Sequence, residues 1–363
     1  MDAPLIAVDV VPLGDSQHAL RCCLQRPKAL NALNRDMIDQ LQQLVDRANS
    51  DPAVAFVVIE GGESRGFCAG GDLKSLVMDI KHSQSLQKGL DFFRAEYRLN
   101  EAIRTSETPI VVWGHGFVMG GGLGLLAPAQ YRVAAPNTVF AMPELAIGLV
   151  PDVGATRFLN DMPHSIGWWL GFSGERFTAS DGVYLGVVDH VIEEPVQSWL
   201  DHMVEQWQPN CNGAELLERT LHDLRCSIVQ SDYELLAESI ESCLDPAASA
   251  DQWADNLWAK MGHHSAGETI DQRWHDSLER VAACPPLVRH VIQQQMIRGA
   301  DLSWQEARLL EFNLVTHRLL RPDFYEGVRC VLFEKERMPV WLESPHESAV
   351  NMHFVRLHDE IPL

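Results

Sequence analysis

Short apolar runs and segments with helical periodicity alternate along the first half of the chain. Two runs of alternating apolar residues, at 5–11 and 19–24, predict a pair of strands joined by a turn. A helix is expected to begin after Asn34, whose side chain can cap it, because apolar residues then recur at helical spacing. A continuous apolar run at 54–59 predicts a strand that is buried on both faces.

The same alternation continues to about residue 195 and then stops. A strand–helix order of this kind predicts an α/β fold with parallel strands. Beyond residue 195 the sequence is almost wholly helical, with amphipathic periodicity at 216–224, 233–243, 272–284, 287–297 and 304–316. We therefore expect an α/β core at 1–195 and a helical C-terminal region at 196–363.

Composition and charge narrow the class of protein. Of the 363 residues 46% are hydrophobic and 22% charged, which is typical of a globular domain. The formal net charge of −21, without a Lys/Arg cluster, argues against a nucleic-acid partner. No apolar run is long enough to cross a membrane, and the first residues lack the basic region of a signal or transit peptide. The expected location is the cytoplasm, and the eight scattered cysteines are expected to be buried thiols.

Two glycine-rich segments follow predicted buried strands, where α/β proteins place their sites. In the segment 66–73, paired glycines lead to Asp72 at a helix start, which offers backbone N–H groups to an anion or oxyanion. The simpler alternative is a tight turn capped by Asp72. The segment 115–124 contains three consecutive glycines, which permit close approach of the backbone to a ligand. His115 is either a base or a structural histidine.

The second glycine-rich segment also raises an alternative function. Residues 122–127 match a dinucleotide-binding fingerprint, and Glu144 lies about 20 residues further on. This spacing favours a nicotinamide-dependent enzyme. Pro128 weighs against it, because it ends the helix after about one turn, and so does Pro143, because Glu144 does not end a clean apolar strand.

A third segment, 140–154, carries two carboxylates in otherwise uncharged, apolar surroundings. These are Glu144 and Asp152. Apolar surroundings disfavour the ionised form of a carboxyl group and raise its pKa, as general acid/base catalysis requires. The alternative is a capped turn and a solvated loop aspartate. Metal-assisted hydrolysis is not indicated, since no metal-ligand constellation accompanies the pair. The absence of a Gly-x-Ser-x-Gly elbow disfavours a serine thioesterase of the α/β-hydrolase type.

Together the three segments resemble the crotonase (enoyl-CoA hydratase/isomerase) superfamily. The resemblance is carried by residues 67–72 and 119–124, in this order and spacing. It implies a spiral of repeated ββα units followed by a helical region. It also implies an oxyanion hole formed by the backbone N–H groups of Ala69 and Gly121, which polarises the thioester carbonyl of an acyl-CoA.

Further segments resemble the branch of this superfamily that hydrolyses short 3-hydroxyacyl-CoA thioesters. They are residues 26–33, 93–100, 141–152 and 323–329. The resemblance implies hydrolysis of 3-hydroxyisobutyryl-CoA to 3-hydroxyisobutyrate and CoA, a step of valine degradation. Gly124 stands where hydratases of the superfamily carry their first catalytic glutamate, and Asp152 stands where many carry glycine, so hydrolysis is favoured over hydration.

The resemblance also assigns roles to individual residues. Glu144 and Asp152 are expected to be the acid/base pair, with Glu144 either activating water or attacking the carbonyl to give a mixed anhydride. Asp152 would orient the 3-hydroxyl group or the water. The residues expected to contact the substrate are Glu96, Gly121, Lys28 and Asp72.

No cofactor and no metal are expected, because CoA is part of the substrate. Its phosphates would be met by backbone N–H groups and by Lys28, Arg65 and Lys74. No nucleic acid or membrane partner is expected, and a homo-oligomer would be in keeping with the superfamily. Two alternatives stay open: hydration or double-bond isomerisation of an enoyl-CoA, and a non-catalytic scaffold.

Overall fold

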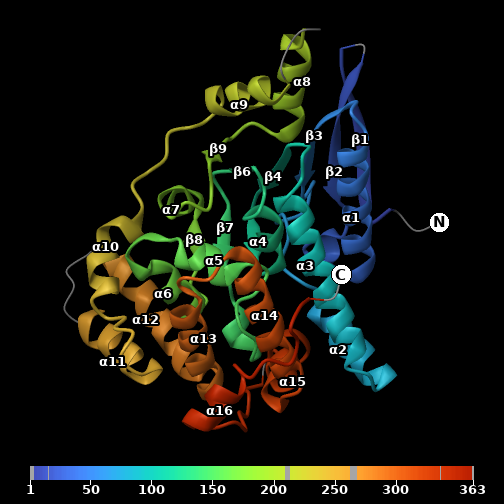
Figure 1. Cartoon of the computed structure of the whole chain (residues 1–363). Helices are drawn as coiled ribbons and strands as arrows, with labels where there is room; N and C mark the ends of the chain where they lie inside the picture. Colours follow the sequence, from blue (N-terminus) through green and yellow to red (C-terminus); the bar gives the residue numbers. More distant parts are fainter. Residues whose placement is uncertain (1–3, 15, 209–212, 262–267, 336, 362–363) are drawn as a thin grey trace. The chain divides into compact units, whose positions relative to one another are not determined.

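The computed structural model describes residues 4–14, 16–208, 213–261, 268–335 and 337–361 (Figure 1). The chain forms two compact units whose segments interleave along the sequence. The first comprises residues 1–71, 95–140 and 177–230, and the second comprises 72–94, 141–176 and 231–363. The domain boundary expected after residue 195 falls inside the first unit. No helix among the described residues has the length and apolar character of a membrane-spanning segment.

A six-stranded sheet with the order β1-β2-β3-β4-β6-β9 organises the first unit (Figure 1). Its strands are β1 (Ile6–Leu13), β2 (Gln17–Leu24), β3 (Val54–Glu60), β4 (Ile110–Gly114), β6 (Tyr131–Ala134) and β9 (His190–Val191). The pair β1/β2 is antiparallel, and every later pairing in the sheet is parallel. The expected α/β architecture with parallel strands is therefore confirmed.

A smaller sheet and several helices complete the first unit. The sheet has the order β5-β7-β8, formed by β5 (Phe117–Met119), β7 (Val139–Ala141) and β8 (Phe177–Thr178). The helices are η1 (Pro27–Ala29), α1 (Arg35–Ser50), most of α3 (Gln87–Arg104), α4 (Gly121–Leu126), α7 (Ala179–Tyr184), α8 (Val196–Gln206) and α9 (Gly213–Asp223). Asn34 caps α1 as expected, since its side chain accepts the N–H of Met37 at 3.0 Å.

Strand β3 is buried on both faces of the large sheet. Phe56 and Val58 on β3 face α8 and α9, where Trp199 stacks between Phe56 and Trp113. The intervening Val57 is equally buried on the opposite face. This arrangement explains the continuous apolar run of β3, because a strand covered on both faces has no polar side.

The second unit is helical. Its elements are α2 (Leu73–Ser83), the start of α3, η2 (Glu144–Ile147), α5 (Ala155–Asn160), η3 (Pro163–Ser165), α6 (Ile166–Ser173), α10 (Asp232–Glu241), α11 (Ala250–Met261), α12 (Glu268–Ala283), α13 (Pro286–Gly299), α14 (Trp304–Leu319), α15 (Pro322–Val328), the π-helical turn η4 (Arg329–Phe333) and α16 (Glu347–Met352). Helices α13 and α14 both contact α5 (Figure 1).

Aromatic residues form much of the core of this unit. Trp169 on α6 stacks on Trp274 of α12, with ring centroids 4.9 Å apart. Trp253 on α11 stacks on Trp168 at 5.5 Å and meets the ring of Phe172 edge-on. Trp253 and Trp274 thus pack α11 and α12 against α6.

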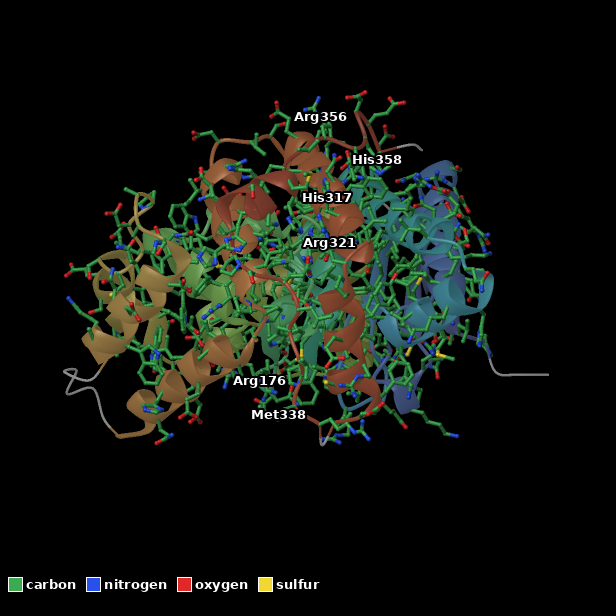
Figure 2. All side chains as sticks on the ribbon, turned by 90° about the horizontal axis from the view of Figure 1, so that it is seen from below. Arg176, His317, Arg321, Met338, Arg356 and His358 are labelled. Atoms are coloured by element: carbon green, nitrogen blue, oxygen red, sulfur yellow. The ribbon has the colours of Figure 1, made fainter. Side chains whose placement is uncertain are left out.

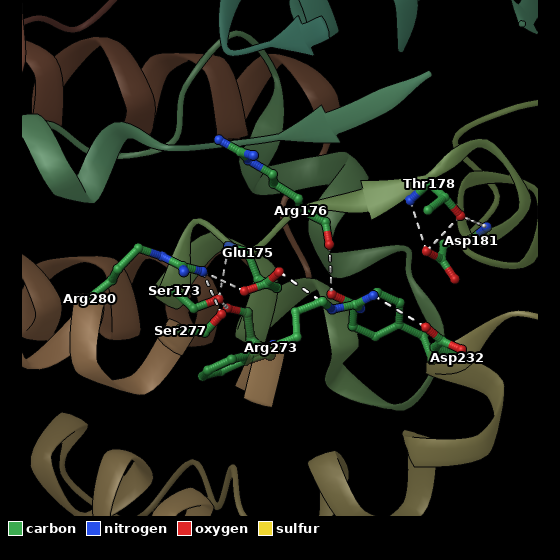
Figure 3. Close-up of polar contacts among 11 residues, drawn as sticks. Ser173, Glu175, Arg176, Thr178, Asp181, Asp232, Arg273, Ser277 and Arg280 are labelled. Carbon is green, nitrogen blue, oxygen red and sulfur yellow. Dashed lines mark hydrogen bonds and ion pairs between the residues drawn. The ribbon is translucent and has the colours of Figure 1, made fainter. Parts of the chain in front are cut away.

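An ion-pair cluster around the buried Glu175 joins the segment that follows α6 to α10 and α12 (Figure 3). Glu175 accepts a hydrogen bond from Arg280 at 2.6 Å and lies 3.6 Å from Arg273. Arg273 also donates to Asp232 at 3.2 Å. A buried carboxylate must be paired in this way, because leaving it without a counter-charge costs several kcal/mol.

Helix α14 differs from the amphipathic helix expected at 304–316. Gln305 and Glu306 in its first turn are exposed, but the polar residues that follow are buried, including Glu311 and Arg318, each 0% exposed. On one side the C-terminal segment covers it (Figure 2), where His317 is hydrogen-bonded to the Val355 carbonyl at 2.9 Å. The expectation was wrong because polar side chains of α14 bind the backbone of other segments and do not face solvent.

Candidate active site

The two glycine-rich segments lie side by side in the first unit. The N–H of Phe67 donates to the His115 carbonyl at 2.8 Å, and the N–H of Met119 donates to the Cys68 carbonyl at 3.0 Å. This pairing leaves no room for a side chain at Gly122, where a Cβ would lie 2.5 Å from the Cys68 carbonyl oxygen. The third glycine of the triplet is therefore required by a close approach of two backbones.

Asn31 ties a third loop to the first glycine-rich segment. It is fully buried in a left-handed conformation, with φ of 55°. Its side-chain amide donates to the carbonyls of Gly61 at 2.9 Å and Phe67 at 3.1 Å, and its Oδ1 accepts the N–H of Arg26 at 2.9 Å. The 26–33 segment thus acts as a support for the glycine-rich loop.

The backbone N–H groups of this region differ in what they bind. The N–H of Ala69, one of the two expected oxyanion-hole donors, donates to the Leu30 carbonyl at 3.0 Å. The nitrogen of Gly71 lies beside Gly121, 3.3 Å from where a Cβ on Gly121 would be. Gly121 is the first residue of α4, so its N–H precedes the helical hydrogen-bond ladder. Gly71, to which the sequence analysis assigns no role, is therefore a neighbour of the expected donor Gly121.

Glu96, an expected substrate contact, also lies beside Gly121. It projects from α3 and is 2% exposed. A Cβ on Gly121 would overlap its carboxylate. Burial raises the pKa of the nearby Cys68 thiol to about 12, and the negative charge of Glu96 adds to the increase. The structure therefore gathers Glu96, Gly71 and Gly121 in one place.

Gly124 occupies the interior of α4. It is buried, and its carbonyl accepts the Asn100 side-chain amide at 2.8 Å. Since glycine has no side chain, this position supplies no carboxylate. His115 is hydrogen-bonded to the Ser64 carbonyl at 3.0 Å, which favours the structural alternative for that residue. Lys28 on η1 and Arg65 are exposed.

The expected acid/base residues belong to the second unit. Glu144 begins η2 and is 6% exposed. Its turn ends at Gly148, which adopts a left-handed φ of 70°, and a Cβ there would lie 2.6 Å from the Asp323 carbonyl oxygen. Gly327 likewise approaches the backbone of Ile147. The segment 323–329, which carries part of the family resemblance, therefore packs directly against the turn that bears Glu144.

Helix α14 binds the same turn. The guanidinium of Arg318 donates to the Gly148 carbonyl at 2.8 Å and to Glu343 at 3.0 Å. These contacts fix the end of η2 from the side of the C-terminal helices, and they account for a fully buried arginine.

Asp152 lies in the loop between η2 and α5 and is 4% exposed. Its carbonyl accepts the N–H of Ala155 at 2.9 Å, which starts α5. Between them Val153 and Gly154 both have positive φ, 54° and 92°. The burial expected for both carboxylates is confirmed, whereas their catalytic roles stay predictions.

Two further expected ligand contacts lie on α2, also in the second unit. The side chain of Asp72 caps the helix by accepting the N–H of Ser75 at 3.1 Å. The ammonium of Lys74 lies 4.8 Å from the centre of the Phe333 ring. The cap is the simpler role considered for Asp72, and substrate binding by either residue stays a prediction.

Comparison with known proteins identifies relatives along nearly the whole chain. The family model described as enoyl-CoA hydratase/isomerase matches residues 19–355. A Xenopus tropicalis protein named 3-hydroxyisobutyryl-CoA hydrolase, mitochondrial, is 34% identical over 342 residues, which cover 92% of this chain and 86% of the relative. The human protein of the same name is 31% identical over 340 residues, with 92% and 85% covered.

Solved structures show the same fold. A carnitinyl-CoA dehydratase from Mycobacterium thermoresistibile is 25% identical with a TM-score of 0.85, covering 99% of each chain. An enoyl-CoA hydratase from Rhodobacter sphaeroides is 29% identical with a TM-score of 0.81, covering 98% of each chain. The expected superfamily fold is confirmed. The animal relatives are named mitochondrial, so the cytoplasmic location expected here stays a prediction.

Proposed function

The chain belongs to the enoyl-CoA hydratase/isomerase family, and from this premise we propose that it hydrolyses 3-hydroxyisobutyryl-CoA to 3-hydroxyisobutyrate and CoA. The relatives that match 92% of the chain at 31–34% identity carry the name of this thioester hydrolase. The family also contains hydratases, so the reaction has to be argued from the residues at the site.

The observation that carries the proposal is the distribution of carboxylates. Glu144 and Asp152 are both buried on short loops, as acid/base residues in apolar surroundings should be. The position of the other hydratase glutamate is Gly124, inside α4. A hydratase needs two carboxylates that act on the double bond and the water. Thioester hydrolysis needs only one, which either activates the water or is itself the nucleophile.

Two routes are open for Glu144. In the first, its carboxylate takes a proton from water while the hydroxide oxygen bonds to the thioester carbon. In the second, the carboxylate itself bonds to that carbon, CoA leaves, and water hydrolyses the resulting mixed anhydride. In both routes the carbonyl π electrons move to oxygen, and collapse of the tetrahedral intermediate breaks the C–S bond and releases CoA, which takes up a proton.

The oxyanion of either intermediate would accept hydrogen bonds from backbone N–H groups. Gly121 supplies one donor in this proposal, and Gly71 supplies the other in place of Ala69, whose N–H binds Leu30. Each such donor typically lowers the barrier by about 3 kcal/mol. Asp152 would orient the 3-hydroxyl group of the acyl chain or the water. Glu96, beside Gly121, would contact the substrate.

A thiol-release assay tests the proposal. Purified protein should release free CoA from 3-hydroxyisobutyryl-CoA faster than from other short 3-hydroxyacyl-CoAs, and it should leave the enoyl absorbance of crotonyl-CoA unchanged. Glu144→Gln should abolish release, while Glu279→Gln, the same change at an exposed carboxylate of α12, should not. Near-normal turnover by the Glu144 variant would rule out its assigned role. Loss of the crotonyl-CoA absorbance would favour the hydratase alternative.

The mixed-anhydride route can be detected by isotope transfer. A single turnover in ¹⁸O water places the label in the product acid if water attacks the thioester directly or attacks the acyl carbonyl of a mixed anhydride. Label found in the peptide containing Glu144 would show that a mixed anhydride forms and that water attacks its enzyme carbonyl.

A further inference from the structure

The loop that carries Asp152 adopts backbone angles that are energetically unfavourable for one of its residues, Val153. Val153 is β-branched and adopts φ of 54°, in the left-handed region. For a residue with a side chain this conformation costs roughly 1–2 kcal/mol, and β-branching makes it rarer still. The next residue, Gly154, also has positive φ. Such a loop persists only where its surroundings hold it.

Glu311, at the middle of α14, holds this loop through two backbone hydrogen bonds. The N–H of Gly154 donates to Oε2 at 2.8 Å, and the N–H of Thr156 donates to Oε1 at 2.7 Å. The carboxylate therefore bridges the two N–H groups that follow Asp152, with both oxygens engaged. Glu311 is 0% exposed, so it does not meet solvent.

A second polar side chain binds the other end of the loop. Gln295 on α13, also 0% exposed, donates to the Pro151 carbonyl at 2.6 Å and to the Thr156 hydroxyl at 2.8 Å. The ring of Trp304 closes the remaining side, where a Cβ on Gly154 would overlap it. The loop is thus bound on both sides of Asp152 by residues of the C-terminal helices.

We propose that Glu311 is a positioning residue for Asp152: by bridging the N–H groups of Gly154 and Thr156 it holds the loop in the conformation that directs the Asp152 carboxylate to the substrate. This inference rests on the proposed function, because positioning of Asp152 by Glu311 affects the reaction only if Asp152 takes part in it. Glu311 acts through the loop and does not touch the substrate.

The carboxyl groups of Glu311 and Asp152 influence each other electrostatically. The pKa of Glu311 is raised to about 8, first by burial and second by the negative charge of Asp152, against the lowering effect of the hydrogen bonds from Gly154 and Thr156. If the Glu311 side chain only filled space, an apolar residue there would give a lower free energy of the folded state than a buried carboxyl group. The two oxygens of Glu311 instead accept hydrogen bonds from the two loop N–H groups, which a hydrophobic residue could not do.

The test compares Glu311→Ala and Glu311→Gln with Glu306→Gln, an exposed carboxylate on the same helix. Steady-state rates are measured on 3-hydroxyisobutyryl-CoA. Glu311→Ala should lower kcat by about 100-fold, as expected for a catalytic group displaced by about 1 Å, and should change KM little. Glu311→Gln keeps one acceptor oxygen and should retain an intermediate rate. Glu306→Gln should behave as wild type.

A double-mutant cycle separates positioning from simple destabilisation. If Glu311 acts through Asp152, adding Glu311→Ala to Asp152→Ala should cause no further loss of kcat. Independent, multiplying losses would overturn the inference, as would a normal kcat in Glu311→Ala. If that variant does not fold, the cycle is carried out with Glu311→Gln. Absence of thioester hydrolysis in the wild-type protein would instead refute the proposed function.

Discussion

Glu311 should make the stability of the protein fall as the pH rises through neutrality. Its side chain is fully buried, and its pKa is raised from 4.5 to about 8, first by burial and then by the charge of Asp152. In the unfolded chain the same group loses its proton near pH 4.5. Between these two values the native state binds the additional proton, so the free energy of unfolding decreases with increasing pH.

The size of the effect follows from the shift. At roughly 1.4 kcal/mol per pH unit, a shift of about 3.5 units corresponds to about 5 kcal/mol over the whole range. The contribution is fully present below about pH 4.5 and fully lost above about pH 8. Between about pH 5.5 and about pH 7.5 the expected loss is about 3 kcal/mol.

Glu311→Gln removes the titration and keeps the shape of the side chain. At low pH the variant should be less stable than wild type by about 1–3 kcal/mol, because its NH₂ group faces one of the two loop N–H donors. This deficit should shrink or reverse as the pH rises, since glutamine stays neutral.

Urea unfolding of both proteins at the two pH values, at constant ionic strength, measures the difference. The other titrating groups are present in both wild type and Glu311→Gln, so their contributions cancel in the difference between the two proteins. Glu306→Gln is the control, because hydrogen bonds from Ser303 lower the pKa of Glu306 and its titration lies below this pH range. If the stabilities of wild type and Glu311→Gln change in parallel with pH, the carboxyl group does not titrate in this range and the reasoning is wrong.

Three further predictions concern the first unit. Gly121→Ala should lower kcat/KM by about 100-fold or more with an unchanged far-UV CD spectrum, because the new Cβ of this expected oxyanion donor would overlap the Glu96 carboxylate. A near-normal rate would show that the reaction takes place elsewhere. Asn31→Ala should destabilise the protein by about 3 kcal/mol in urea, since it deprives buried carbonyls of their donor; a change below about 0.5 kcal/mol would contradict this. The Cys68 thiol, with its pKa raised to about 12, should resist alkylation in the native protein and react after unfolding, as peptide mass spectrometry can show; rapid native labelling would contradict its burial.

The local elements could be predicted because their signals are local. A strand covered on both faces is an uninterrupted apolar run, as in β3, and a helix start is marked by a capping residue such as Asn34. The buried carboxylates Glu144 and Asp152 could be found for a similar reason, since they are the charged residues of an otherwise apolar stretch.

The supports of the site could not be predicted in this way. Glu311, Gln295 and Arg318 look like the solvent-facing residues of amphipathic helices, and their partners are backbone groups more than 100 positions away. The choice between Ala69 and Gly71 likewise depends on which N–H is already bound by the Leu30 carbonyl. Neither kind of contact leaves a periodic or compositional mark in the sequence.

The interleaving of the two units has a consequence for the order in which they can assemble during synthesis. The first unit, with Gly71, Gly121 and Glu96, contains no residue beyond 230. The loops of Glu144 and Asp152 are translated before the last segment of that unit, but their anchoring residues on α13 and α14 emerge from the ribosome more than 100 residues after the loops. The loops of the two proposed acid/base residues can therefore be anchored only after α14 has been translated, and a truncated chain that ends before α13 should be inactive even with every expected catalytic residue present.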